Sequence, residues 1–120
     1  MKPVIVTLHL LLAILLLPSA TAIAQDQQTM NRQAGADFTK ADAEMNKIYA
    51  KVIATLDDEG KAKLKAAQRA WVAFRDAEAA FQADREARDG SMAPLIYEGT
   101  RSRLTKERTK TLKETIEGQR

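Results

Sequence analysis

The stretch Gln68–Asp76 contains the residues best suited to specific chemistry in this chain. It reads Gln-Arg-Ala-Trp-Val-Ala-Phe-Arg-Asp and includes the only tryptophan. An exposed Trp beside two arginines would form a platform for a ligand. Alternatively, Trp71, Phe74 and Phe81 form one helical stripe that packs into the core, as aromatic residues at helical spacing usually do. We favour the core interpretation.

Nucleophilic and acid–base chemistry is limited by the residue types that the chain lacks. The sequence has no Cys, and its single His is His9, which falls within a predicted leader. The exported chain would therefore have neither His nor Cys. This excludes Ser-His and Cys-His nucleophiles, disulfide exchange and the usual zinc sites. Because only carboxylates remain as acid–base groups, we predict that the protein is not an enzyme.

Two charged residues fall on otherwise apolar helical faces. Glu78 follows the Trp71 stripe, and Arg108 lies on the apolar face of the C-terminal segment. Since an unpaired buried charge is costly, we predict that they pair with each other, or that Arg108 reaches Asp76 or Glu44. An interhelical ion pair that fixes register is favoured over a catalytic role, because a small helical bundle offers little concave surface.

An acidic run, Asp57-Asp58-Glu59, has the ligand type that a hard cation such as calcium prefers. Its spacing differs from that of an EF-hand loop, and acidic turns are common in proteins that bind no metal. We therefore predict no metal site, and nothing else in the sequence indicates a cofactor.

The N-terminus has the organisation of a secretory signal peptide. Lys2 supplies a positive start, Val4–Leu17 is a mostly apolar run, and Ala22-Ile23-Ala24 is a small-x-small cleavage signal. A second such set two residues earlier leaves a choice of cleavage positions. The apolar run is shorter than the roughly 20 residues that a membrane-spanning helix needs. We expect residues 1–24 to be cleaved and residues 25–120 to be periplasmic or secreted, without membrane insertion.

The remaining chain is long enough for one domain with one core. The full sequence has a net charge of +3, and loss of Lys2 with the leader brings this to about +2. A basic balance is compatible with nucleic-acid binding, but the positive and negative charges are interspersed along the chain and the leader indicates export. We therefore predict a protein partner and no nucleic acid.

Apolar residues recur at steps of three and four residues in three segments, at about residues 29–56, 61–88 and 92–117. This spacing predicts amphipathic helices, and no segment after the leader shows the alternation of a strand. Short connections make neighbouring helices antiparallel. We therefore predict an all-α protein, an elongated antiparallel three-helix bundle without disulfides.

The predicted connections are short polar turns. Gly60 ends the acidic run and is a plausible stop for the first helix. In the second turn, Ser91 is the expected N-cap of the third helix, with Pro94 tolerated in its first turn.

Several segments resemble one known family. Asp42–Tyr49 reads Asp-Ala-Glu-Met-Asn-Lys-Ile-Tyr, Gln68–Glu78 carries the Trp-centred motif, and Leu104–Leu112 continues with Leu-Thr-x-x-Arg-x-x-x-Leu. Together they resemble the lysozyme inhibitor LprI-like domain over nearly all of residues 25–120. The resemblance implies a small helical domain of the bacterial envelope.

The residues that carry the resemblance are Asn46, Tyr49, Gln68, Trp71, Phe74, Arg75, Glu78 and Arg108. We interpret them mainly as residues of the fold. Similar sequences often have Cys where this chain has Gln33, Ala79 and Thr100. The disulfide bonds that would link helices in those proteins are therefore missing here.

The resemblance implies an exported binding protein, with lysozyme as its candidate partner. Lysozyme works with two carboxylates in a cleft, so an inhibitor that occludes it non-covalently would insert basic groups. The candidates are exposed arginines near the second turn, namely Arg85, Arg88, Arg101 and Arg103. The alternative is a structural or adaptor module of the envelope, with an unknown protein partner and no inhibitory activity. The sequence leaves the oligomeric state open.

Overall fold

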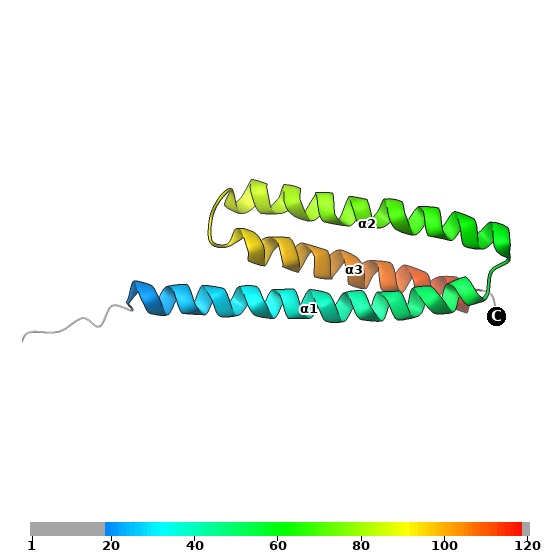
Figure 1. Ribbon diagram of the computed structural model, residues 1–120, viewed down its shortest axis with the longest axis horizontal. Coiled ribbons are helices and arrows are strands. Elements are labelled where there is room, and N and C mark those ends of the chain that lie inside the picture. The colour runs from blue at the N-terminus through cyan, green and yellow to red at the C-terminus, as the bar shows by residue number, and fades with distance from the viewer. Residues whose placement is uncertain (1–18, 119–120) are drawn as a thin grey trace, which may run out of the picture.

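Three long helices make up almost all of residues 19–118, the range that the computed structural model describes (Figure 1). They are α1 (Ala20–Ala54), α2 (Asp58–Ala87) and α3 (Ala93–Glu117). The predicted all-α, elongated and antiparallel architecture is confirmed. With 35 residues, α1 is about 52 Å long. Most of the predicted leader, residues 1–18, lies outside the described range.

Helix α3 lies against both of the other helices. It forms an antiparallel hairpin with α2 and also runs along α1, which continues past the α2–α3 turn (Figure 1). The backbones of α1 and α2, by contrast, approach each other little. Long side chains from α2 therefore have to bridge the distance to α1.

The first helix begins earlier than the sequence predicts. It starts at Ala20 rather than near residue 29, and Ser19 is its N-cap, with the Ser19 hydroxyl accepting a hydrogen bond from the Ala22 amide at 3.4 Å. The helix then continues without a break through Gly35 to Ala54. The prediction failed here because the first three turns have no apolar face, although their residues are compatible with a helix.

The two turns differ in detail from the prediction. Gly60 does not stop a helix, since it lies in the first turn of α2 and donates its amide to the N-cap Asp57 at 2.8 Å. Asp58 and Glu59 are in the same turn, where negative charge is favoured by the helix dipole. The N-cap of α3 is Met92, without a side-chain hydrogen bond, rather than Ser91.

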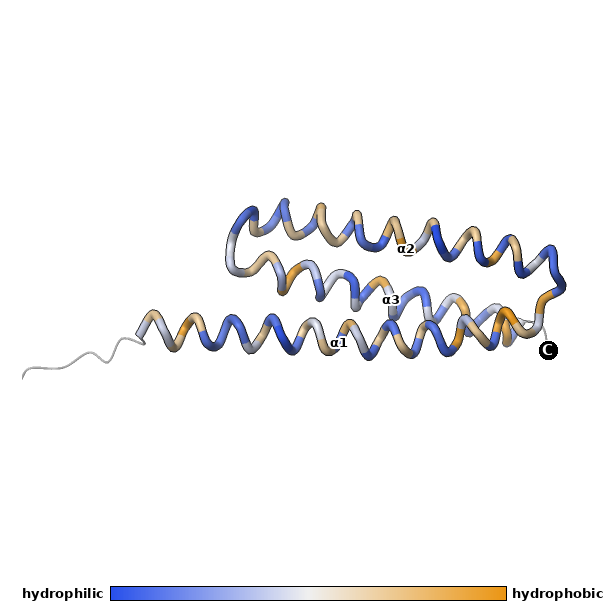
Figure 2. Tube along the Cα trace, viewed as in Figure 1, coloured by the Kyte–Doolittle hydropathy of each residue, from blue (hydrophilic) through white to orange (hydrophobic). Residues whose placement is uncertain are grey.

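The apolar core lies in the half of the bundle next to the α1–α2 turn. Its buried members are Met45, Ile48, Val52 and Leu112, with Tyr49, Leu56, Leu64, Trp71 and Ile116 packed around them. Strongly hydrophobic positions gather toward this end of α1 (Figure 2). The three- and four-residue apolar spacing that predicts the first helix includes Ala41, Met45, Ile48 and Val52, and these residues are buried, so the predicted inward face of α1 is correct.

Small residues allow α1 and α3 to pack closely. Ala34 and Ala41 are buried on α1, and Ser102, Thr105 and Thr109 are buried on α3. The Thr109 hydroxyl donates to the Thr105 carbonyl at 2.9 Å. The Thr105 hydroxyl is fully buried and makes no hydrogen bond within the described range.

The predicted inward face of α2 is wrong at two of its three aromatic positions. Phe74 is 54% exposed and Phe81 is 56% exposed, whereas Trp71 is half-buried against the core. The buried residues of α2 are Gln68, Arg75, Ala79 and Ala83. At 100° per residue, the two Phe side chains lie more than a quarter turn around the helix from that face.

Candidate functional site

A buried arginine occupies the centre of the molecule. Arg75 projects from α2 toward α1 and is only 4% exposed. Its Nη1 donates to Asp42 Oδ1 of α1 at 2.9 Å, and its Nε donates to Asp76 Oδ1 at 2.9 Å. The guanidinium also lies 5.0 Å from the ring centroid of Phe38 and 5.3 Å from that of Trp71. Arg75 therefore fills the space between α1 and α2 with a paired charge.

A second arginine joins the same cluster from α3. Arg101 Nε donates to Asp76 Oδ1 at 3.1 Å, and Nη1 donates to Glu98 Oε2 at 3.2 Å. Its guanidinium lies 3.6 Å from the Phe38 ring centroid, within cation–π range. We call Asp42, Arg75, Asp76, Glu98 and Arg101 the arginine cluster. It ties the three helices together through charge-assisted hydrogen bonds.

The electrostatic environment of Asp76 opposes a role for this residue in proton transfer. Burial disfavours the charged form of Asp76, but hydrogen bonds and charges from Arg75 and Arg101 outweigh it and hold the pKa of Asp76 below its ordinary value of 3.8. A general acid at neutral pH needs the opposite shift. The cluster is therefore suited to holding helices together.

Gln68 and Arg108 form a second polar contact between α2 and α3. Arg108 Nε donates to Gln68 Oε1 at 3.0 Å, and the guanidinium lies 5.8 Å from the Trp71 ring centroid. Gln68 Nε2 in turn points to Met45 Sδ at 3.5 Å, a weak acceptor. Burial lowers the pKa of Arg108 from its usual value.

The predicted ion pair of Glu78 and Arg108 is wrong. Within residues 19–118, Arg108 forms no ion pair, and Glu78 accepts a hydrogen bond from Gln82 at 2.6 Å on its own helix. The charge pairs that cross between helices are made instead by Arg75 and Arg101. Buried charges are paired in this fold, but the residues involved are Arg75 and Arg101 and not Glu78 and Arg108.

The other motif residues divide between the clusters and the surface. Asn46 donates to Asp42 Oδ2 at 3.3 Å and so supports the carboxylate that binds Arg75. Tyr49 packs against the apolar core. Phe74 is separated from all of these contacts because it faces outward.

The four candidate arginines do not form one surface. Arg101 was expected to be exposed, but its side chain is only 18% exposed and belongs to the arginine cluster. The exposed Arg85, Arg88 and Arg103 pair with Glu86, Asp84 and Glu107, respectively, at 2.6–3.0 Å. A hydrogen bond from Arg88 lowers the pKa of Asp84, which keeps this pair ionised. The positive charge at the α2–α3 turn is thus largely neutralised locally.

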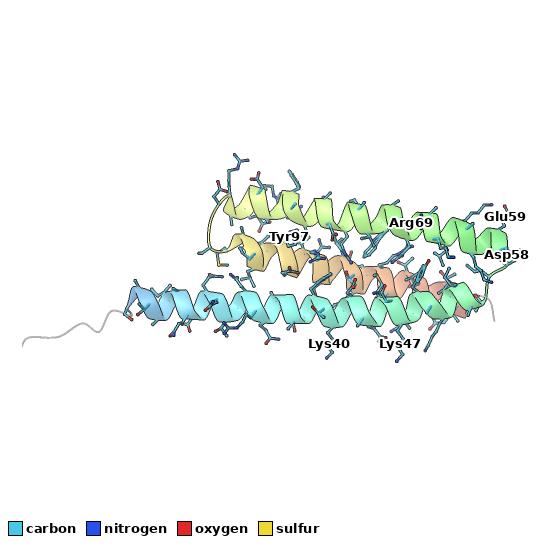
Figure 3. All side chains as sticks on the ribbon, in the orientation of Figure 1. Lys40, Lys47, Asp58, Glu59, Arg69 and Tyr97 are labelled. Atoms are coloured by element: carbon cyan, nitrogen blue, oxygen red, sulfur yellow. The ribbon has the colours of Figure 1, made fainter. Side chains whose placement is uncertain are left out.

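Exposed lysines gather along α1 and α3, beside a groove between these two helices. The groove has a volume of about 600 Å³ and is lined by Asp37, Lys40, Ala41, Glu44, Lys106, Thr109, Lys110 and Lys113. Lys47 and Lys51 continue the series along the exposed side of α1. Lys40 and Lys47 project from the side of α1 that faces away from α2 (Figure 3). We call Lys40, Lys47, Lys51, Lys106, Lys110 and Lys113 the lysine face.

The lysine face keeps most of its charge free. Its ion pairs in the described part of the chain are Lys110–Glu114 at 3.9 Å and Lys113–Glu44 at 3.5 Å. Lys40, Lys47, Lys51 and Lys106 form none there. This distinguishes the face from the paired arginines, and sequence reasoning missed it because the lysines come from two helices.

This chain is thus a cysteine-free three-helix bundle whose helices are linked by a buried arginine cluster. The sequence model of the lysozyme inhibitor LprI family matches residues 19–112, and the chain belongs to this family. It is also 38% identical over 107 residues to the uncharacterized protein R02472 of Rhizobium meliloti (strain 1021). That match covers 78% of this chain and 76% of the relative.

No solved structure shows a significant match to this chain. None of the helices within residues 19–118 combines the length and the apolar character that crossing a bilayer requires.

Proposed function

We propose that this protein is a non-enzymatic inhibitor of lysozyme, which it binds through the lysine face. The observation that carries the function is the match of the lysozyme inhibitor family over residues 19–112. The choice of surface rests on charge. A lysozyme-type cleft contains two catalytic carboxylates, and unpaired ammonium groups are complementary to them.

The exposed side of α1 has the shape of a ridge that fits into the cleft of an enzyme. Lys40 and Lys47 are two turns apart on an exposed helix surface, and no ion pair within the described range restrains them. A straight helix already fixed by packing loses little conformational freedom on binding. Lysine side chains are long enough to extend from this ridge into a cleft, while the helix backbone stays at the rim.

We further propose that the chain is exported and that residues 1–24 are removed. The sequence of the leader supports this, and an inhibitor has to meet its enzyme outside the cytoplasm. The experiment is cell fractionation followed by mass spectrometry of the intact protein. We expect a periplasmic or secreted species that begins near residue 25, and a cytoplasmic species that begins at Met1 would contradict the proposal.

The inhibition assay uses the purified protein and several types of lysozyme acting on bacterial cell walls. We expect inhibition of at least one type at micromolar concentrations. No inhibition of any type at micromolar excess would contradict the function and would favour an adaptor role in the envelope.

The surface is tested with a matched pair of double variants. Lys40→Gln/Lys47→Gln should weaken inhibition by about 30-fold or more, as for the loss of charges buried against a partner. Arg85→Gln/Arg88→Gln removes the same charge from the α2–α3 turn and should change inhibition less than about threefold. The reverse result would assign the interface to the arginines and overturn the assignment to the lysine face.

A further inference from the structure

The outer face of α2 is apolar, although no helix within residues 19–118 covers it. The exposed residues on this side, between Lys63 and Asp84, are Ala66, Ala67, Ala70, Ala73, Phe74, Ala77, Ala80 and Phe81. They cover about 140° of the helix circumference without a charged or polar residue. We call this set the α2 outer face. Apolar positions recur along the whole middle of α2 (Figure 2).

The residues of the α2 outer face have the spacing of a helix–helix seam. Ala67, Ala70, Phe74, Ala77 and Phe81 follow one another at alternating steps of three and four residues. This is the repeat by which one helix packs along another in a coiled coil. Single exposed apolar residues are ordinary, but a continuous seam marks an interaction site.

The chemistry of the seam identifies a second copy of this chain as its occupant. Ala and Phe alternate from Ala70 to Phe81, so an antiparallel copy related by a two-fold axis level with the Arg75–Asp76 bond places each Phe against an Ala. Phe74 then faces Ala77 of the partner subunit, and Phe81 faces Ala70 of the partner subunit. A self-complementary patch of this kind is what a two-fold symmetric interface requires.

The charges at the two ends of the seam favour the antiparallel orientation. Lys63 precedes the seam with Glu59 one turn before it, and Asp84 follows the seam with Arg88 one turn after it. In the antiparallel register, Lys63 faces Arg88 of the partner subunit, with Glu59 one turn to one side of this contact and Asp84 of the partner subunit one turn to the other. Each end of the seam therefore combines one like-charge contact with two attractive ones. A parallel pair would place all four of these charges against their own copies, and would align the helix dipoles unfavourably.

We propose that the α2 outer face joins two copies of this chain into an antiparallel, two-fold symmetric dimer. Complete coverage of the half-exposed Phe residues and the exposed Ala residues would bury about 500 Å² per copy, or about 1,000 Å² in total. This is the lower end for specific interfaces, so the dimer is weak and depends on concentration. The lysine face lies on α1 and α3 and stays accessible, so each dimer presents two copies of it.

Sedimentation equilibrium of the full protein from about 1 to 500 μM tests the association. We expect the average mass to rise from one chain toward two. Ala70→Glu places a charge in the seam without removing a buried contact, and it should keep the mass at one chain across the range. The control Met30→Glu changes an exposed apolar residue of α1, which is 44% exposed, and should associate as the wild type does.

Single-cysteine variants test the orientation, because the chain has no cysteine of its own. Ala77→Cys lies next to the two-fold axis and should form a disulfide-linked dimer on mild oxidation. Ala67→Cys should not, because the two copies of residue 67 are about 25 Å apart in the antiparallel register. Equal cross-linking of both variants would indicate a parallel pair and overturn the register.

The proposal is overturned if the wild-type protein stays monomeric throughout the range, or if Ala70→Glu leaves its association unchanged. It does not depend on lysozyme inhibition. A monomeric protein that inhibits lysozyme through the α2 outer face, with inhibition lost in Ala70→Glu, would likewise overturn it and assign this face to the enzyme.

Discussion

Met45 and Arg75 are both almost completely buried, yet they stabilise the bundle by opposite means. Met45 lies among Ile48, Val52 and Leu112 and contributes through the removal of hydrocarbon from water. Arg75 lies one to two helical turns farther toward the α2–α3 turn and contributes through carboxylates and aromatic rings. Where α2 stands away from α1, a long charged side chain bridges a distance that a small apolar residue would leave empty.

This contrast also explains why the protein needs no disulfide. The chain has no cysteine, and its fully buried apolar side chains are few. The arginine cluster links α1, α2 and α3 by geometry-specific contacts in the half that has little hydrocarbon to bury. It therefore fixes the register of the helices where the apolar core does not reach.

The largest expected effect is that of Met45→Ala in the apolar core. Met45 is 1% exposed, and truncation of such a side chain costs about 2–5 kcal/mol because a cavity remains. Urea unfolding followed by circular dichroism measures the loss. Met30→Ala, at an exposed Met on α1, should change the free energy of unfolding by less than about 0.5 kcal/mol. A loss below about 1 kcal/mol for Met45→Ala would show that this half is loosely packed.

Arg75→Ala should cost less, at about 2–3 kcal/mol, even though Arg75 is nearly as buried. Loss of one partner from a buried ion pair typically costs more. Here, however, the side chains of Asp42 and Asp76 are 34% and 39% exposed, so water can solvate them in the variant. Asn46 and Arg101 also retain their hydrogen bonds to these carboxylates. A loss equal to that of Met45→Ala, measured by the same unfolding experiment, would contradict this account.

The smallest expected effect is in the acid range and concerns Asp76→Asn. Because the folded pKa of Asp76 lies below 3.8, the ionised group stabilises the fold above that pH, and this contribution is lost as the pH falls through the folded pKa. Asp76→Asn should therefore lower stability at pH 6 and flatten its decline between about pH 4 and pH 2. Unfolding midpoints across this range measure both effects.

The matched control for that prediction is Asp84→Asn. A hydrogen bond from the exposed Arg88 lowers the pKa of Asp84 as well. About 0.5 M salt should abolish the effect of Asp84→Asn, because exposed charges are screened, and should leave much of the effect of Asp76→Asn. Equal salt sensitivity of the two variants would show that the arginine cluster is no better shielded than the surface.

The sequence predicted the three helices, their antiparallel order and the inward face of α1, because these depend on apolar spacing. It failed on α2 because the inward-facing positions include Gln68 and Arg75, whereas the outward-facing positions include Phe74 and Phe81. Hydropathy therefore predicted that the face of α2 with Phe74 and Phe81 is buried, whereas the buried face is the one with Gln68 and Arg75. The sequence feature that indicates the buried face of α2 is a set of four residues on one helical face, which mixes polar with apolar side chains: Leu64, Gln68, Trp71 and Arg75.

The candidate site was harder to predict because it depends on which helices are neighbours. Arg101 and Arg103 are two residues apart and look equivalent in the sequence. Only the packing of α3 against Phe38 and Asp76 buries the first and leaves the second exposed. The lysine face was missed for the same reason.

The first turns of α1 lie outside the part of the bundle that determines its stability. Residues 20–26 are helical, yet every one of them is exposed. Their amide hydrogens should exchange with solvent almost as fast as those of a free peptide, whereas the amide of Met45 should exchange only when the whole bundle opens. A protease that cuts anywhere in this segment therefore meets a substrate that unwinds readily. The bundle tolerates the resulting variation in its N-terminus, and its melting temperature should be insensitive to it.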